Sequence, residues 1–332
     1  MKHILLATTA LVATAGVASA NENIALSGSA EMGLIGGTFI ETGFHTDIDI
    51  TFTMTGEADN GLTFGAKVDL DENGAFANST QGGETLFIAY GPAKLTMGDV
   101  DGAFDAAMKE AIIGSAINDD HEQGLGAFTT GGEEFSFGGY NGNSGLDGVY
   151  DGQIAQLEYS ASGFTGYLSV ELDDTDDGGD PIWGVGVRYS ADLAGLALGV
   201  GLGYQAGDLN GDADDGNVSV WGVSVDTTFN NGIQGILNYS STDFGSDDDQ
   251  THVGVAFGYT MNALTIGVNM GKYENRGGFA DLTTKGYGLA VDYDLGGGLQ
   301  AQFGYGYAEI EDEATDFSDD ANSWSLGLAM SF

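Results

Sequence analysis

Apolar residues alternate with small or polar residues, without exception, over the last ten positions of the chain. The apolar set is Trp324, Leu326, Leu328, Met330 and Phe332. Successive side chains of a β-strand point to opposite faces, so this segment has one apolar face and one small or polar face. The same period of two recurs at 48–54, 196–204, 253–259, 287–293 and 299–307. This pattern restricts the chain to an all-β fold whose sheet has a different environment on each side.

The chain contains sixteen segments of this kind, and their lengths centre on the ~9–11 residues that a tilted membrane strand needs. They lie at 24–34, 44–56, 61–71, 84–91, 94–99, 153–161, 163–172, 183–191, 195–206, 217–229, 232–242, 251–260, 263–273, 284–294, 298–310 and 322–332. Short turns alternate with long, often acidic loops, of which 99–152 is the longest. This asymmetry predicts a 16-stranded antiparallel transmembrane β-barrel with short periplasmic turns and long acidic outer loops.

The charge balance excludes several classes of protein. The chain has 50 Asp and Glu against 8 Lys and Arg, a formal net charge of −42, so nucleic acid is excluded as a partner because its phosphates would be repelled. The absence of cysteine excludes a disulfide scaffold and a thiolate metal site. Beyond residue 20 only His45, His121 and His252 are histidines, and none adjoins a Ser or Cys nucleophile. We therefore expect no enzymatic activity.

Residues 1–20 have the pattern of a cleaved secretory signal peptide. Lys2 precedes an apolar run over 4–17, and the small residues Ala18, Ser19 and Ala20 form a cleavage site. The run is shorter than the ~20 residues of a membrane-spanning helix. Loss of Lys2 would take the formal charge from −42 to −43. Residues 21–332 are then expected to form a single barrel, exported to the cell outer membrane.

Several short motifs, in this order and spacing, resemble the 16-stranded general porins of alphaproteobacteria, the Rhodobacter-type trimeric porins. The motifs are 24–33, 52–56 with 60–66, 95–99, 285–292 and the terminal Phe332. The resemblance implies a homotrimer of water-filled pores in which the third long loop, about 99–152, folds inward as a constriction. It also implies that Trp324 and Phe332 lie in an aromatic-ending strand that the outer-membrane barrel insertion machinery recognises.

The alternation also predicts which charged residues face the lumen. The wall set is Glu31, Asp47, Asp49, Lys67, Asp69, Arg188, Asp226 and Asp292, and the constriction-loop set is Asp99, Asp101, Asp105, Glu110, Asp119, Asp120 and Glu122. Members of the family tend to carry arginines on the wall where this chain has Glu31, Asp47 and Asp49. Because carboxylates around a pore concentrate cations, we expect cation selectivity. The alternative is that these acids form an ordinary solvated face.

Two further features concern the loops. Residues 103–117 read as a short amphipathic helix whose apolar side packs on the wall, with a helix that caps the barrel mouth as the alternative. The acidic outer loops are candidate Ca²⁺ or Mg²⁺ ligands, with solvated charge as the alternative. Such cations would bridge the loops to lipopolysaccharide. The residues in question are Asp212, Asp214, Asp247 and Asp248.

The function expected from these features is passive diffusion of small hydrophilic solutes and ions through an outer-membrane pore. Two alternatives stay open. A substrate-specific outer-membrane channel would carry aromatic tracks in its lumen, and none is evident in the sequence. A secreted calcium-binding β-solenoid or adhesin would show a short fixed repeat, which this chain lacks.

Overall fold

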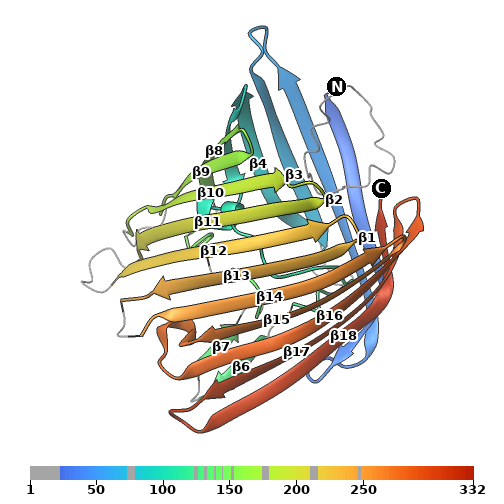
Figure 1. The fold of residues 1–332 in the computed structure, drawn as a ribbon, viewed down its shortest axis with the longest axis vertical. Helices are drawn as coiled ribbons and strands as arrows, with labels where there is room; N and C mark the ends of the chain where they lie inside the picture. Colours follow the sequence, from blue (N-terminus) through green and yellow to red (C-terminus); the bar gives the residue numbers. More distant parts are fainter. Residues whose placement is uncertain are drawn as a thin grey trace.

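The computed structural model describes residues 23–72, 79–122, 126–130, 133–137, 140–143, 145–150, 153–173, 179–209, 216–245 and 248–332. Sixteen antiparallel strands close into one barrel in which each strand pairs with its neighbours in the chain (Figure 1). The first and last strands complete the ring, with Met32 of β1 opposite Leu328 of β18. Among the described residues, no helix has the length and apolarity needed to cross a membrane.

The first part of the barrel contains seven strands. Other elements are inserted into the chain at one point, between β5 and β8. Its strands are β1 (Ile24–Gly37), β2 (Gly43–Glu57), β3 (Thr63–Glu72), β4 (Ser79–Tyr90), β5 (Ala93–Asp99), β8 (Gln153–Ala161) and β9 (Phe164–Glu171). Between β5 and β8 lie the helix α1 (Ala103–Ala107) and a separate two-stranded sheet of β6 (Gly126–Thr130) and β7 (Glu133–Phe137).

The second half is a regular meander of nine strands. These are β10 (Ile182–Asp192), β11 (Leu196–Asp208), β12 (Asn217–Phe229), β13 (Ile233–Asp243), β14 (Gln250–Met261), β15 (Leu264–Glu274), β16 (Leu282–Gly296), β17 (Leu299–Asp312) and β18 (Phe317–Ser331). The 3₁₀ helix η1 (Arg276–Gly278) lies between β15 and β16. The sixteen barrel strands, their antiparallel pairing and their order are confirmed.

Within 99–152 one local prediction was wrong and one element was not predicted. The helix expected over 103–117 ends at Ala107, because Met108 is already extended (φ −83°, ψ 163°) and Gly114 has a positive φ of 87°. An extended chain rises further per residue than a helix, so it reaches more strands of the wall with the same apolar residues. The hairpin β6–β7 was also not expected, although Gly131 and Gly132 in the sequence are a hairpin-turn signal.

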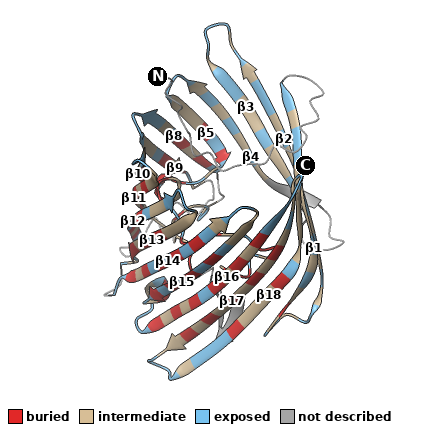
Figure 2. Cartoon of the chain, turned by 45° about the vertical axis from the view of Figure 1, so that its right-hand side comes forward, coloured by how far each residue is buried: buried red, intermediate tan, exposed pale blue. Residues whose placement is uncertain are grey.

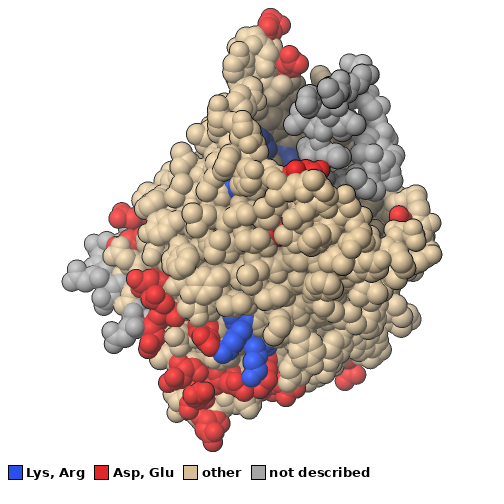
Figure 3. All heavy atoms as spheres, in the orientation of Figure 1, with Lys and Arg blue, Asp and Glu red and all other residues tan. Residues whose placement is uncertain are grey.

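The two faces of the barrel wall differ as the alternation predicts. On β14 and β15, Phe257 and Met270 are 55% and 61% exposed on the outside, whereas their neighbours Ala256 and Asn269 are 3% and 7% exposed. Figure 2 shows the resulting alternation of exposed and buried positions along these strands. In Figure 3, Asp and Glu gather at the strand ends that meet the long connections, and the band between the two ends is neither acidic nor basic. A barrel with an apolar outer band and charged edges suits a bilayer.

Candidate functional site

Residues 100–152 are here called the inward loop, and its described segments 102–121 and 140–143 lie against the inner wall of the barrel. Glycines on that wall make the close approach possible, because a Cβ at Gly186 would lie 2.1 Å from the carbonyl oxygen of Ala103. A Cβ at Gly267 would lie 1.8 Å from the carbonyl oxygen of Ile113, and one at Gly306 1.7 Å from that of Asp120. These contacts carry the loop from β10 round to β17. The inward loop therefore rests on wall positions where glycine leaves room for its backbone.

Apolar side chains of the inward loop fill the space between it and the wall. Phe104 and Met108 pack with Ile182, Val218 and Val220 in one buried cluster. Further along, Ala111 and Ile113 pack with Ile236 and Ala256, and Ile117 reaches the seam between Gly33 and Gly327. The burial of these side chains stabilises the loop in its inward position.

Hydrogen bonds from wall side chains fix the backbone of the inward loop at intervals. Ser169 Oγ accepts from the Ala103 N–H (2.8 Å), and Ser224 Oγ accepts from the Lys109 N–H (2.9 Å). Asp292 accepts both the N–H and the hydroxyl of Ser115, at 3.1 and 3.3 Å. Asn269 Nδ2 donates to the His121 carbonyl oxygen at 2.7 Å. A loop that is held on four strands has a fixed shape and can set the width of the lumen.

The two ends of the inward loop meet at a pair of carboxyl groups. Asp147 accepts the Gly102 N–H at 2.6 Å and a hydrogen bond from Gln205, which also accepts the Leu146 N–H at 2.9 Å. Asp105 lies against Asp147, and its burial, followed by the negative charge of Asp147, raises the pKa of Asp105. The neutral Asp105 carboxyl can donate to the Asp147 carboxylate, which joins the start of the loop to its end.

A wall carboxylate also holds the last part of the inward loop. Glu171 of β9 accepts the N–H groups of Gly148 and Tyr150, both at 3.1 Å.

The wall of β1 to β3 carries an uncompensated group of carboxylates. Glu31 pairs with Asp47 across β1–β2, and Asp49 pairs with Asp71 across β2–β3. Carboxylate oxygens of Asp47, Asp49 and Asp71 all lie within 4.8 Å of one another. This donor set fits a hard divalent cation. Asp71 was not among the predicted lumen residues because the expected strand ended there.

Asp119 and Glu122 bring further negative charge to this region from the inward loop. Burial raises the pKa of Asp119; His121 and His45 oppose that shift, and the carboxylates of Asp120 and Asp47 add to it. The pKa of Glu122 is raised to about 7, first by burial and then by Asp119 and Glu110. At neutral pH Glu122 is therefore close to half-charged.

Three basic side chains of the barrel wall lie beside acids or an aromatic ring. Lys67 Nζ lies 2.6 Å from Asp69, and Arg188 forms an ion pair with Asp226. Lys94 is opposite Glu158 in the β5–β8 register and lies 5.3 Å above the centre of the Phe87 ring. None of these three bases pairs with Glu31, Asp47, Asp49 or Asp71. Of those four carboxylates, Glu31 has the His45 imidazole beside it, with His45 Nε2 at 3.6 Å.

The structure places all eight predicted wall residues on the inward face but gives them different surroundings. Glu31, Asp47 and Asp49 lie together, Lys67 with Asp69 and Arg188 with Asp226 form separate ion pairs, and Asp292 is a loop anchor. Of the predicted loop residues, Asp99 is exposed at the end of β5 rather than in the inward loop. Within the loop, Asp101 and Glu110 are exposed, whereas Asp120 is fully buried against Gly304 and Gly306. The charge of Asp120 is thus shielded from the opening.

The candidate outer-loop calcium ligands are mostly outside the described residues. Asp212, Asp214 and Asp247 fall there, and Asp248 is exposed beside β14. Among the described residues, a group of three carboxylates close enough to share a metal ion is formed by Asp47, Asp49 and Asp71 on the wall.

Comparison with known proteins decides the family. A family model described as Gram-negative porin matches residues 7–315. The chain belongs to the Gram-negative porin family. A search of curated proteins found no match. Family and fold together indicate a channel for passive diffusion in the outer membrane rather than an enzyme.

Solved porin structures share the fold of this porin. A porin refined at 1.8 Å resolution has a TM-score of 0.66 and 21% identity, over 93% of this chain and all of that one. Two mutants of Rh. blastica porin, at 21% and 24% identity, have TM-scores of 0.62 and 0.59 with the same coverage. At this level of identity the likeness establishes the 16-stranded barrel, and the chemistry of the lumen has to be argued from this chain's own residues.

The aromatic end of the porin lies at the barrel seam. The N–H of Phe332 donates to the Gly28 carbonyl oxygen at 2.9 Å, and the Phe332 ring is 61% exposed. Trp324 is opposite Gly36 on β1 and Tyr305 on β17. Of the predicted assembly signal, Trp324 therefore lies in the strand that closes the barrel, and Phe332 directly follows that strand.

Proposed function

We propose that this porin is a cation-selective, water-filled pore for passive diffusion of small hydrophilic solutes and ions. The observation that carries the proposal is the group of Glu31, Asp47, Asp49 and Asp71 on one part of the wall, near Asp119 of the inward loop. Carboxylates in a narrow, water-filled passage with low-dielectric walls raise the local concentration of cations and repel anions.

The pairing of the lumen bases supports the sign of this selectivity. Lys67 and Arg188 are next to Asp69 and Asp226, so their positive charge is largely cancelled where it occurs. Among the described residues, Glu31, Asp47, Asp49 and Asp71 have as a basic neighbour only the imidazole of His45, which lies beside Glu31. The net field at the inward loop is thus negative.

Liposome swelling with solutes of similar size tests this proposal. Porin-containing liposomes should swell faster in a cationic amino acid ester than in a neutral amino acid of similar mass, and slowest in an acidic amino acid. Rates should rise linearly with solute concentration, as diffusion requires. Saturation for one solute would favour a substrate-specific channel, and equal rates for the three charges would contradict cation selectivity.

The family resemblance also suggests how the chain is exported, assembled and held in the outer membrane. We propose that residues 1–20, which lie outside the described residues, are a cleaved signal peptide. The mature chain is then a homotrimer whose last strand is recognised by the barrel insertion machinery and whose acidic loops meet lipopolysaccharide through Ca²⁺ or Mg²⁺. Mass spectrometry of the purified protein should find Asn21 as the first residue and three chains per particle.

A further inference from the structure

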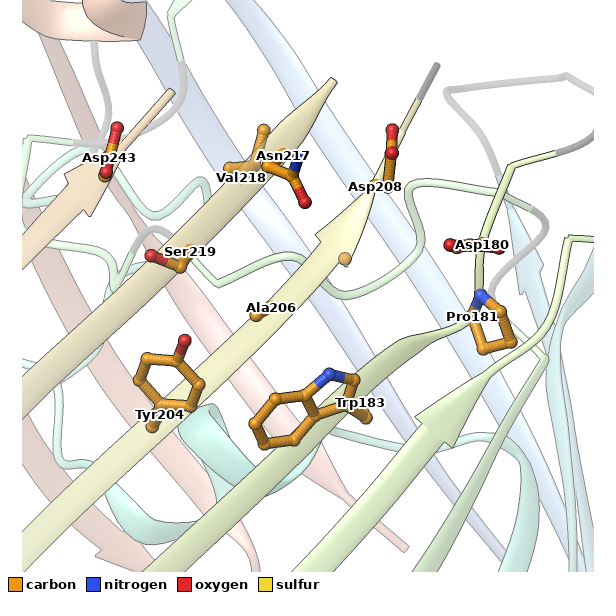
Figure 4. A pocket seen from close by; sticks show the side chains of 11 residues that line it. Asp180, Pro181, Trp183, Tyr204, Ala206, Asp208, Asn217, Val218, Ser219 and Asp243 are labelled. Atoms are coloured by element: carbon orange, nitrogen blue, oxygen red, sulfur yellow. The ribbon is translucent and has the colours of Figure 1, made fainter. Parts of the chain in front are cut away.

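A pocket of about 650 Å³ opens on the outside of the barrel, where β10 to β13 meet long connections (Figure 4). Most of its side chains on these strands belong to the outward-facing set, and the exception is Val218, which is buried on the lumen side. Trp183 in the pocket is 50% exposed, whereas its neighbour Ile182 faces the lumen and is 1% exposed. The pocket therefore lies outside the passage for solutes, and the channel function does not account for it.

The hollow arises from small residues between large ones. Ala206 is paired with Trp183 on one side and with Ser219 on the other, so the centre of the pocket has little side chain. The Trp183 and Tyr204 rings lie side by side in Figure 4, with centres 5.3 Å apart and planes tilted by 48°. Together the two rings offer a broad aromatic surface below the small residues.

The polar rim of the pocket is built on strand ends and is held by the backbone. Asp208 is paired with Asn217 and Ser219 with Asp243 in the barrel register. The Asp180 N–H donates to the Asp208 carbonyl oxygen at 3.0 Å, which joins the start of β10 to the end of β11. A rim on regular strands is pre-organised, so little conformational entropy is lost when a ligand binds.

We propose that this pocket binds the sugar head group of an outer-leaflet glycolipid, the saccharide part of lipopolysaccharide. A pyranose ring has an apolar C–H face, which suits Trp183 and Tyr204, and an edge of hydroxyl donors. The carboxylates of Asp180, Asp208 and Asp243 accept such donors, and Asn217 can both donate and accept. This inference rests on the proposed function, because it requires the long loops to lie at the outer face of the outer membrane.

Charge and position favour the sugar over the phosphate groups of such a lipid. None of the described lining residues is Lys or Arg, and a phosphate would meet the three carboxylates. Directly along the same strands from the pocket, Val185, Leu202 and Leu237 are 43%, 52% and 53% exposed on the outer face. Acyl chains can lie on this apolar band while the sugar occupies the pocket.

The test uses the full-length porin in detergent and oligosaccharide released by mild acid from lipopolysaccharide. Binding is followed by calorimetry for wild type, Trp183→Ala and the double variant Asp180→Asn with Asp208→Asn. The matched control is Trp221→Ala. Trp221 is 46% exposed in the same aromatic band and opposite Tyr204, but it does not line the pocket. Channel conductance is recorded for every preparation.

We expect saturable binding that Trp183→Ala and the double variant each weaken by about tenfold, as loss of one aromatic or hydrogen-bonding contact predicts, with Trp221→Ala within about twofold of wild type. Conductance should stay unchanged. Any one of three results overturns the proposal. They are the absence of saturable binding, an equal loss of affinity in Trp183→Ala and Trp221→Ala, and abolition of binding by EDTA, which would mean that cations bridge phosphate groups to the pocket. Absence of conductance in the wild-type porin would instead contradict the proposed pore function.

Discussion

Asp49 lies directly opposite Asp71 across the β2–β3 ladder, and the carboxylate of Asp47 lies within 4.8 Å of both. Like charges directly opposite each other destabilise a sheet. Ser29 offsets part of this cost by donating its hydroxyl to Asp49 at 3.0 Å. The porin thus concentrates carboxyl groups on one part of its wall, and these groups are the physical basis of the proposed cation selectivity.

Reversal of charge at this group should reverse the preference of the pore. Asp47→Arg combined with Asp49→Arg should lower the permeability ratio of K⁺ to Cl⁻ by about tenfold, because the local potential changes sign. Single-channel recording in a salt gradient measures the ratio. Asp59→Arg, in the exposed turn after β2, is the matched control and should change the ratio little. An unchanged ratio in the double variant would mean that these side chains do not face the passing ions.

Selectivity should also depend on pH in the neutral range. Because the pKa of Glu122 is raised to about 7, this carboxyl gains negative charge as pH rises through 7 and loses it as pH falls. Cation preference should therefore increase between pH 6 and pH 8. Recordings of Glu122→Gln should show a flatter pH profile at the level of the acidic wild type. A preference that rises on acidification would contradict this role.

The sequence predicted the barrel in nearly all respects because period-two alternation reports which solvent each face meets. It predicted the inward loop less well. The segment after Ala107 has helical spacing of apolar residues, but its conformation is decided by wall glycines such as Gly186 and Gly267, which are far away in sequence. Likewise, the sequence could not show that Asp120 is buried by Gly304 and Gly306, or that Asp71 joins Asp47 and Asp49.

The close contact between the inward loop and the wall glycines can be tested at one glycine. Gly267→Ala places a Cβ where the Ile113 carbonyl oxygen lies only 1.8 Å away, so the loop backbone must move. We expect the free energy of unfolding to fall by about 1–3 kcal/mol, with altered single-channel conductance. Gly166→Ala, where a Cβ meets nothing within 4 Å, is the control and should match wild type in both measurements. Wild-type conductance and stability in Gly267→Ala would show that the loop does not rest there.

Removal of the last residue should affect assembly more than conduction. Phe332 contributes the hydrogen bond to Gly28 at the barrel seam and an exposed ring at the chain end, but no side chain to the lumen. Deletion of Phe332 should reduce the yield of folded, heat-modifiable porin in outer-membrane fractions. Channels that do form should have wild-type conductance. Equal yield with reduced conductance would contradict an assembly role.

The zero-current potential of the wild-type porin in a planar bilayer tests the central claim most directly. With concentrated KCl on one side and dilute KCl on the other at pH 8, a negative lumen lets K⁺ cross faster than Cl⁻. The dilute side should therefore become positive. A dilute side that becomes negative, or a potential of zero through open channels, would contradict cation selectivity set by Glu31, Asp47, Asp49 and Asp71.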